Sequence, residues 1–187
     1  MNVYDFDDTI YDGDSTIDFF WFCFKKNKKI IQYFPKWMKV AILYKLKKIS
    51  KTQMKEVFFV FLKDIENVEE EIELFWNKNE SKIKQWYLQS QKEDDLVISA
   101  SPEFLLKPIC QKIGIQNLIA SNVDKKTGKF YDENCKGEEK VKQFRQKYKD
   151  ASIENFYSDS LSDTPLASIA KNAYLVVGNA RKTWPQK

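Results

Sequence analysis

Acidic side chains follow the first apolar segment of this 187-residue chain. Residues 1–5, MNVYD, form a short apolar run that ends in acid, and the polar loop of residues 5–9, DFDDT, overlaps its end. Side chains alternate along extended backbone, so Asp5 and Asp7 can point into one cleft while Phe6 faces the core. Paired carboxylates in a cleft can act as a nucleophile and as a proton donor or acceptor. Acid-rich loops after strands are also common as turns, so this segment alone leaves both interpretations open.

Two further polar segments follow apolar runs in the same way. One run ends at Ser99, and another leads into SDSLSD, which contains Asp159 and Asp163. A serine at a strand end is equally typical of a turn that caps the next helix, and we expect Ser101, which precedes a proline, to be such a cap. The three polar segments together indicate a shared site.

The chain contains no histidine, which excludes Ser-His-Asp hydrolysis, histidine phosphoenzymes and zinc sites that depend on imidazole. Catalysis would have to use carboxylates, hydroxyls and lysines. The three cysteines are far apart and form no CxxC pair, so reduced thiols are the simplest interpretation. The densest apolar run, FFWFCF, falls far short of the roughly 20 residues of a membrane-spanning helix, and no secretory signal is visible. We therefore expect a cytoplasmic protein.

The segments that must position these side chains follow a pattern that predicts an α/β fold. Short apolar strands alternate with helical segments, which favours a Rossmann-like parallel sheet of about five strands with helices on both faces. In such sheets sites form at the carboxyl ends of the strands, where all the polar segments lie. Residues 117–124 and 128–131 predict a hairpin or an irregular crossing.

The long segment of residues 15–90 differs from the rest. Apolar residues recur there at three- and four-residue intervals, which predicts about three or four helices. We expect breaks near Asn27, Pro35, residues 50–52 and Asn67. The predicted organisation is a core domain of residues 1–14 and 88–187 with an inserted helical cap of residues 15–87.

The order and spacing of the polar segments resemble the haloacid dehalogenase-like superfamily. Its first motif, DxDx(T/V), is similar to residues 5–9, its second to Ser99, and its fourth, (G/S)DxxxD, to residues 158–163. Each motif alone is common, but their joint order along the chain is specific. The helical insertion resembles the cap of subfamily IB, which includes phosphoserine phosphatase.

The resemblance implies a role for each matched residue. Asp5 would attack phosphorus to form an aspartyl phosphate, while Asp7 would protonate the leaving alcohol and then activate water. The Ser99 hydroxyl and the N–H of Ala100 would hold a phosphoryl oxygen. Thr9, the last residue of the first motif, would be a further phosphate contact.

The third motif of the family is a lysine that neutralises the phosphate and the nucleophile. Lys136 and Lys140 are one helical turn apart and both fit the position. We favour Lys136 because phosphoserine phosphatase-like members place their lysine before a glycine at a helix start, where anions are stabilised. Lys140 is then expected to contact phosphate, and a purely solvated role is the alternative for either lysine.

The resemblance also implies a Mg²⁺ cofactor. Asp5, the backbone carbonyl of Asp7 and Asp159 would be its ligands, since Mg²⁺ is usually held by one or two carboxylates with water and substrate phosphate. Asp163 would complete the metal site through water or by orienting Lys136. An N-cap for the following helix is the alternative role of Asp163.

The expected cap would select the substrate, and its composition leaves the choice open. Phosphoserine phosphatase places a Glu after the first motif to hold the substrate's ammonium, and Asp14, a shorter acid, stands at that position here. The cap is also aromatic and rich in lysine. One interpretation is contact with an anionic membrane surface or a lipid phosphate, as in phosphatidylglycerophosphate phosphatases of this subfamily. We favour the other, in which the aromatic residues pack the cap and the lysines are solvated.

The sequence therefore predicts a Mg²⁺-dependent phosphatase that hydrolyses the phosphate monoester of a small metabolite or a lipid head group. Phosphoserine and a phosphatidylglycerophosphate-type lipid are the specific alternatives. A non-catalytic module that binds through a basic helical surface is the alternative from another class, although it would not need the carboxylates. The net charge of +4 is modest and scattered, so we expect no nucleic acid partner. The oligomeric state is not indicated.

Overall fold

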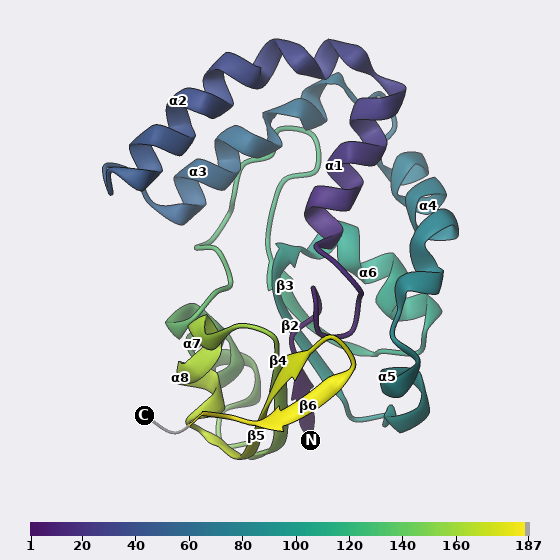
Figure 1. Ribbon diagram of the computed structural model, residues 1–187, viewed down its shortest axis with the longest axis vertical. Helices are drawn as coiled ribbons and strands as arrows, with labels where there is room; N and C mark the ends of the chain where they lie inside the picture. The colour runs from purple at the N-terminus through teal and green to yellow at the C-terminus, as the bar shows by residue number, and fades with distance from the viewer. Residues whose placement is uncertain (186–187) are drawn as a thin grey trace.

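The structure, a computed structural model, describes residues 1–185. A sheet with helices beside it forms the lower part of the molecule, and an arm of helices stands above the sheet (Figure 1). The expected division into a core of residues 1–14 and 88–187 and a cap of residues 15–87 stays a prediction, and residues 186–187 lie outside the described part.

A six-stranded sheet has the order β3-β2-β1-β4-β5-β6. Its strands are β1 (Asn2–Tyr4), β2 (Leu96–Pro102), β3 (Asn117–Ser121), β4 (Ile153–Ser158), β5 (Ala170–Val177) and β6 (Ala180–Thr183). Strands β1 to β5 pair in parallel, which confirms the expected parallel sheet. The antiparallel edge strand β6 was not expected from the sequence. It follows a tight hairpin in which Gly178 adopts a φ of 61°, a conformation that favours glycine.

Helices cover both faces of the sheet, as expected. They are α5 (Gln85–Ser90), α6 (Glu103–Lys112), α7 (Glu138–Tyr148) and α8 (Thr164–Ala167). Because side chains alternate along a strand, Val3 packs in one apolar cluster with Phe144 of α7, while Tyr4 packs in the other with Tyr87 of α5. Because the strands are parallel, their carboxyl ends meet at the same edge of the sheet, and this edge faces the arm (Figure 1).

The arm consists of helices that succeed one another between β1 and α5. They are α1 (Ser15–Lys26), η1 (Lys28–Tyr33), α2 (Phe34–Lys45), α3 (Lys51–Phe58), η2 (Phe59–Asp64), α4 (Val68–Asn79) and η3 (Glu80–Lys82). The expected breaks are confirmed: Asn27 ends α1, Pro35 lies in the first turn of α2, Ser50 caps α3 through a capping box with Gln53, and Asn67 caps α4. No helix within residues 1–185 is long and apolar enough to cross a bilayer.

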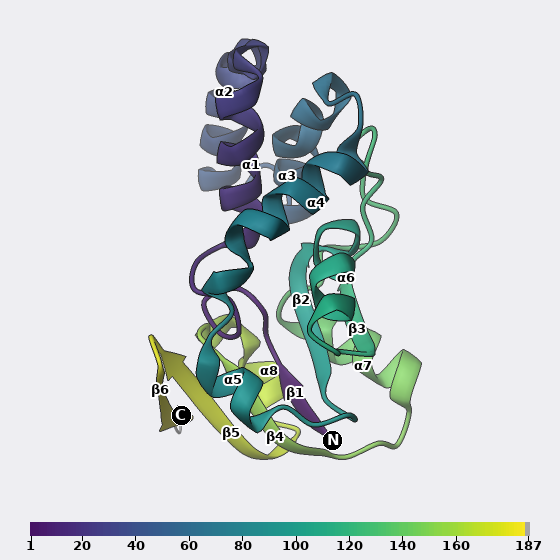
Figure 2. The same ribbon diagram turned by 90° about the vertical axis from the view of Figure 1, so that its right-hand side faces the viewer.

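Helix α4 joins the arm to the sheet, because it descends beside α6 towards α5 (Figure 2). The indole N–H of Trp76 donates to the carbonyl of Leu105 at 2.7 Å, and one apolar cluster continues from the arm into the sheet. The loop of residues 122–134 makes a second connection, since the N–H of Phe130 donates to the Glu56 carboxylate of α3 at 3.0 Å. This loop contains the expected hairpin, with an antiparallel bridge between Val123 and Phe130.

Gly128 lies at the tip of that loop, against η2. Its φ is 75°, and a Cβ at this position would lie 2.5 Å from the Cβ of Phe59. Only glycine fits such a close approach without displacement. The arm is therefore held over the carboxyl edge of the sheet by α4 and by this loop.

Candidate active site

Asp5 directly follows β1, the strand flanked by β2 and β4 in the sheet. Its N–H donates to the carbonyl of Tyr157 at 2.8 Å, and its Oδ1 accepts the N–H of Phe6 at 2.9 Å. Burial raises the pKa of the Asp5 carboxyl, and the Lys140 ammonium opposes that rise. The backbone of the sheet thus fixes this carboxyl group at the floor of a cavity.

Lys140, in the first turn of α7, is the lysine against Asp5. Its side chain is 1% exposed, and its Nζ lies 2.9 Å from Asp5 Oδ1 and 2.6 Å from Asp163 Oδ2. Burial lowers the pKa of Lys140, but the two carboxylates more than offset this and raise it above its ordinary value. The geometry departs from the expectation for Lys136, which is exposed and lies on the cavity wall. Gly137, with a φ of 60°, turns the chain between the two lysines.

Asp163 lies behind Lys140 and away from bulk solvent. Its Oδ2 accepts the Ser158 hydroxyl at 2.9 Å in addition to the lysine, while its Oδ1 is buried without a hydrogen-bond partner among residues 1–185. Asp163 precedes α8 but makes no side-chain capping bond to it, so the alternative role as an N-cap is not realised. The lysine that it contacts is Lys140, and the expected contact with Lys136 is not formed.

Asp7 is held between the start of α1 and the end of β2. The N–H of Ser15 donates to Oδ1 at 2.7 Å, and the Ser101 hydroxyl donates to Oδ2. Burial, reinforced by the charge of Asp14, raises the pKa of Asp7 to about 7. Such a carboxyl group can donate and accept protons near neutrality. The expectation that Ser101 caps α6 is wrong, because Pro102 occupies the cap position and the hydroxyl serves Asp7.

The second expected motif lies at the end of β2 in the same cavity. Ser99 and Ala100 both line it, and the buried Ser99 hydroxyl accepts the N–H of Ser101 at 3.1 Å. The carbonyl of Ala100 accepts the Lys55 ammonium at 2.7 Å. A cation from the arm therefore contacts the residue whose N–H was expected to hold phosphate.

Thr9 does not line the cavity, contrary to its expected role as a phosphate contact. It is fully buried, and its hydroxyl accepts the N–H of Asp159 at 3.0 Å. Thr9 thus holds the loop after β4 against the loop after β1. Burial, and then the charges of Asp5 and Asp8, raises the pKa of Asp159 to about 6.

The expected metal residues are brought together only in part. Asp7 and Asp163 are engaged by hydroxyls, a backbone N–H and Lys140, and Asp5 is engaged through Oδ1 by Lys140 and the N–H of Phe6. Among residues 1–185, no hydrogen bond or ion pair occupies Oδ2 of Asp5 or the side chain of Asp159. Within residues 1–185, no three His, Cys, Asp or Glu side chains are gathered at metal-binding spacing. Two carboxylates, a carbonyl oxygen and water are nevertheless a donor set that fits Mg²⁺, and mutual repulsion of the carboxylates favours a cation between them.

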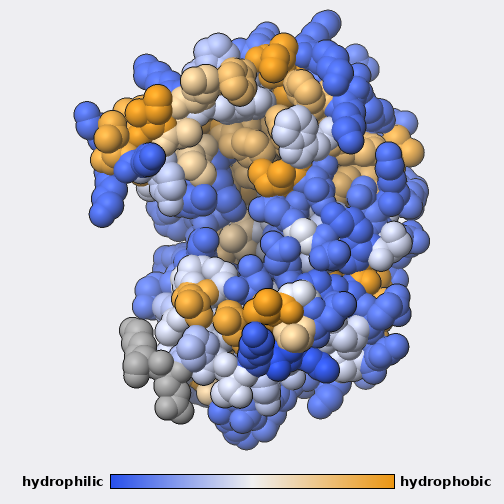
Figure 3. Space-filling model, in the orientation of Figure 1, coloured by the Kyte–Doolittle hydropathy of each residue, from blue (hydrophilic) through white to orange (hydrophobic). Residues whose placement is uncertain are grey.

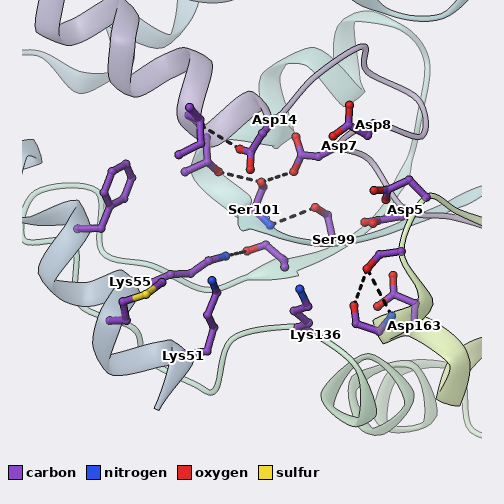
Figure 4. A pocket seen from close by; sticks show the side chains of 18 of the residues that line it. Asp5, Asp7, Asp8, Asp14, Lys51, Lys55, Ser99, Ser101, Lys136 and Asp163 are labelled. Atoms are coloured by element: carbon purple, nitrogen blue, oxygen red, sulfur yellow. Dashed lines mark hydrogen bonds between the residues drawn. The ribbon is translucent and has the colours of Figure 1, made fainter. Parts of the chain in front are cut away.

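A cavity of about 420 Å³ connects this floor to the arm. Figure 4 shows the carboxylates of Asp5, Asp7 and Asp8 across from Lys51 and Lys55, which extend from α3. Its remaining wall is apolar and is contributed by α1, α2 and α3: Ile17, Trp37, Val40, Ala41, Met54 and Phe58. Burial, and then the neighbouring Lys51, lowers the pKa of Lys55 to about 8. The cavity can therefore hold an anion at one end and an apolar group at the other.

Asp14 lines this cavity at the start of α1, where its Oδ1 accepts the N–H of Ile17 at 2.9 Å and caps the helix. Sequence reasoning missed Asp8, Lys51 and Lys55 as cavity residues. The two lysines are four residues apart on one helix face, which is a visible signal. Other lysines of the arm have similar spacing, so the signal does not identify the pair that faces the sheet.

A comparison with protein families gives the decisive observation. The model of the haloacid dehalogenase-like hydrolases matches residues 3–168. The chain belongs to the haloacid dehalogenase-like hydrolase family. The match extends from the segment before Asp5 to the segment after Asp163, which confirms the resemblance and the expected hydrolase class. No curated protein shows significant similarity to the sequence.

Solved structures share the fold of this haloacid dehalogenase-like hydrolase over most of its length. A Bordetella pertussis Tohama I protein of unknown function is 20% identical, with a TM-score of 0.72 over 94% of this chain and 88% of its own. A phosphoserine phosphohydrolase-like protein from Francisella tularensis subsp. tularensis SCHU S4 is 17% identical, with a TM-score of 0.58 over 94% and 87%. A phospho-aspartyl intermediate analogue of phosphoserine phosphatase is 17% identical, with a TM-score of 0.56 over 92% and 84%.

Proposed function

We propose that this family hydrolase is a Mg²⁺-dependent phosphatase that cleaves a phosphate monoester through an aspartyl phosphate on Asp5. The observation that carries the proposal is the buried contact of Asp5 with Lys140 at the cavity floor. A carboxylate nucleophile needs a neighbouring positive charge when an anionic phosphoryl group approaches it, and Lys140 supplies that charge. The phosphoserine phosphatase fold of two similar structures supports the same reaction class.

In the first step, a carboxylate oxygen of Asp5 bonds to phosphorus while the bond from phosphorus to the ester oxygen breaks. The leaving oxygen takes its proton from Asp7, whose pKa of about 7 keeps much of it protonated at neutral pH. The Ser99 hydroxyl and the Ala100 N–H hold a phosphoryl oxygen. Lys140 offsets the negative charge that gathers between Asp5 and the phosphoryl group.

In the second step, the Asp7 carboxylate takes a proton from water, and the water oxygen bonds to phosphorus. The bond from phosphorus to Asp5 breaks, which releases inorganic phosphate and regenerates both carboxyl groups. When bound by Asp5, Asp159 and the carbonyl of Asp7, Mg²⁺ supplies positive charge that balances the phosphoryl oxygens. The buried Asp163 orients Lys140 for both steps.

The organic part of the substrate would lie against the arm. Trp37 and Phe58 offer it an apolar wall, and Lys51 and Lys55 offer positive charge beside that wall. These surfaces favour a small phosphate ester with some apolar surface, and phosphoserine and a lipid head group are the two specific candidates to compare. The cysteines are buried free thiols, which suits a reducing cytoplasm.

The test is hydrolysis of para-nitrophenyl phosphate with Mg²⁺ and with EDTA, followed by phosphoserine and a lysophospholipid phosphate. We expect magnesium-dependent turnover that Asp5→Asn reduces to background without loss of folding. Asp12→Asn is the matched control, because Asp12 is exposed in the same loop and does not line the cavity. Turnover that survives Asp5→Asn would contradict the mechanism, and a folded wild type that is inactive on all three esters would favour a binding module.

A further inference from the structure

Helix α2 is apolar, yet none of its residues is buried. A row of large apolar side chains runs along it and its flanks, and all are more than half exposed: Ile31, Phe34, Met38, Ile42 and Leu46, called the α2 row below. Figure 3 shows apolar side chains gathered along the upper edge of the molecule, where α2 lies. A helix with so much apolar surface is ordinarily covered by a partner.

The substrate cavity does not explain the α2 row. The α2 residues on the cavity wall are Trp37, Val40 and Ala41, and no member of the row lines it. Among residues 1–185, eight of the thirteen exposed large apolar side chains lie between Ile17 and Leu46, so the exposure is concentrated in one segment rather than scattered. Scattered apolar residues need no partner, whereas a contiguous patch indicates one.

The stretch of residues 19–55, which contains the α2 row, is strongly basic. Residues 19–55 contain eleven lysines and no Asp or Glu, although the whole chain has a net charge of only +4, so the rest is net acidic. The lysines that flank the row are exposed and form no ion pair within residues 1–185: Lys36, Lys39, Lys45, Lys47 and Lys48. An apolar row edged by unpaired lysines is the pattern of a helix that lies in the interface of an anionic membrane.

We propose that the α2 row and its flanking lysines dock this hydrolase onto an anionic lipid surface, with α2 in the plane of the interface. A second copy of the chain is a poorer occupant, because a symmetric contact would bring two lysine-rich faces together. Negatively charged head groups match the flanking lysines, and acyl chains match the apolar α2 row. The proposal goes beyond the proposed function and does not depend on it.

The test is co-sedimentation of the full chain with vesicles of phosphatidylcholine alone and of phosphatidylcholine mixed with phosphatidylglycerol. We expect binding to the anionic vesicles only. Ile42→Gln with Leu46→Gln should lower the partition coefficient on the order of tenfold, and Lys45→Gln with Lys47→Gln should also lower it. Leu74→Gln with Val177→Gln is the matched control, because both side chains are exposed outside the segment.

The possible results of this test distinguish a lipid surface from a second copy of the chain as the partner of the α2 row. Absence of binding to anionic vesicles overturns the proposal, and so does binding that the Ile42 and Leu46 substitutions leave unchanged. A dimer that the same substitutions dissociate, without any vesicle binding, would assign the row to a contact between copies and would also overturn it. None of the substituted residues lines the cavity, so all variants should hydrolyse soluble para-nitrophenyl phosphate like the wild type. Loss of docking is therefore distinguishable from loss of the phosphatase.

Discussion

Lys140 joins Asp5 to Asp163, with its Nζ 2.9 Å from one carboxylate and 2.6 Å from the other. The three groups come from the end of β1, the first turn of α7 and η4 (Leu161–Asp163), the short helix that follows β4. Because the lysine is shielded from water, solvent cannot stabilise the two carboxylates if the lysine side chain is removed. The contact thus couples the stability of the sheet edge to the chemistry proposed there.

Lys140→Met should abolish phosphatase activity and destabilise the fold by about 3–5 kcal/mol, because it leaves Asp5 and Asp163 buried without a counter-charge. Lys136→Met is the matched control, and its free energy of unfolding should stay within about 0.5 kcal/mol of wild type, since that lysine is exposed. Urea unfolding and steady-state kinetics measure both. An inactive Lys136→Met beside an active Lys140→Met would instead support the preference drawn from the sequence.

Lys55 should make substrate binding depend on pH. Its pKa of about 8 means that the ammonium loses its charge as the pH rises through 8, so KM for an anionic ester should increase above that pH. Lys55→Met should raise KM below pH 8 and remove the rise above it. Lys39→Met, an exposed lysine outside the cavity, should keep the wild-type profile. A Lys55→Met profile that retains the rise would exclude this lysine as its source.

The requirement for Mg²⁺ should increase in acid. Asp159 has a pKa of about 6, so below that pH the cation must displace a proton from its proposed ligand. We expect the concentration of Mg²⁺ for half-maximal activity to rise by roughly tenfold for each pH unit below 6. Kinetics at several Mg²⁺ concentrations between pH 5 and 7.5 measure it, and a constant requirement over that range would argue against Asp159 as a ligand.

Gly128→Ala should destabilise the protein by about 1–3 kcal/mol, since the new Cβ would overlap Phe59 in addition to straining the backbone. Gly114→Ala is an informative control: Gly114 has a φ of 85°, but the nearest atom to its Cβ would be 3.5 Å away. It reports the cost of the backbone conformation alone, about 1 kcal/mol. Equal losses in urea unfolding would show that the contact with η2 contributes nothing.

The parallel part of the sheet could be predicted from the sequence because its strands have local apolar signals. Apolar runs that end at Asp5, at Ser99 and before Asp159 mark the strands and the edge at which they meet. The antiparallel strand β6 was missed, because its residues, ARKT, are all exposed and carry no apolar signal.

The site was predicted less completely, since spacing along a chain does not give the direction of a side chain. The sequence favoured Lys136 over Lys140, but the chain turns at Gly137, which has a φ of 60°, and Lys140 is the lysine that contacts Asp5. Ser101 precedes a proline, as helix-capping residues often do, yet its hydroxyl donates a hydrogen bond to Asp7, which is distant in the sequence. The position of Lys51 and Lys55 in the cavity depends on how the arm is placed over the sheet. No local sequence pattern gives that placement.

The central position of β1 has a consequence for biosynthesis. Val3 pairs in register with Leu96 on one side and with Phe156 on the other. Because the ribosome delivers residues in order, β1 must wait until the residues of β4 have been synthesised before both of its neighbours exist. Until then Asp5 also lacks Lys140. A growing chain should therefore complete the proposed catalytic centre only after Lys140 and Asp163 have been synthesised, and a product truncated before them would carry Asp5 without the groups that contact it.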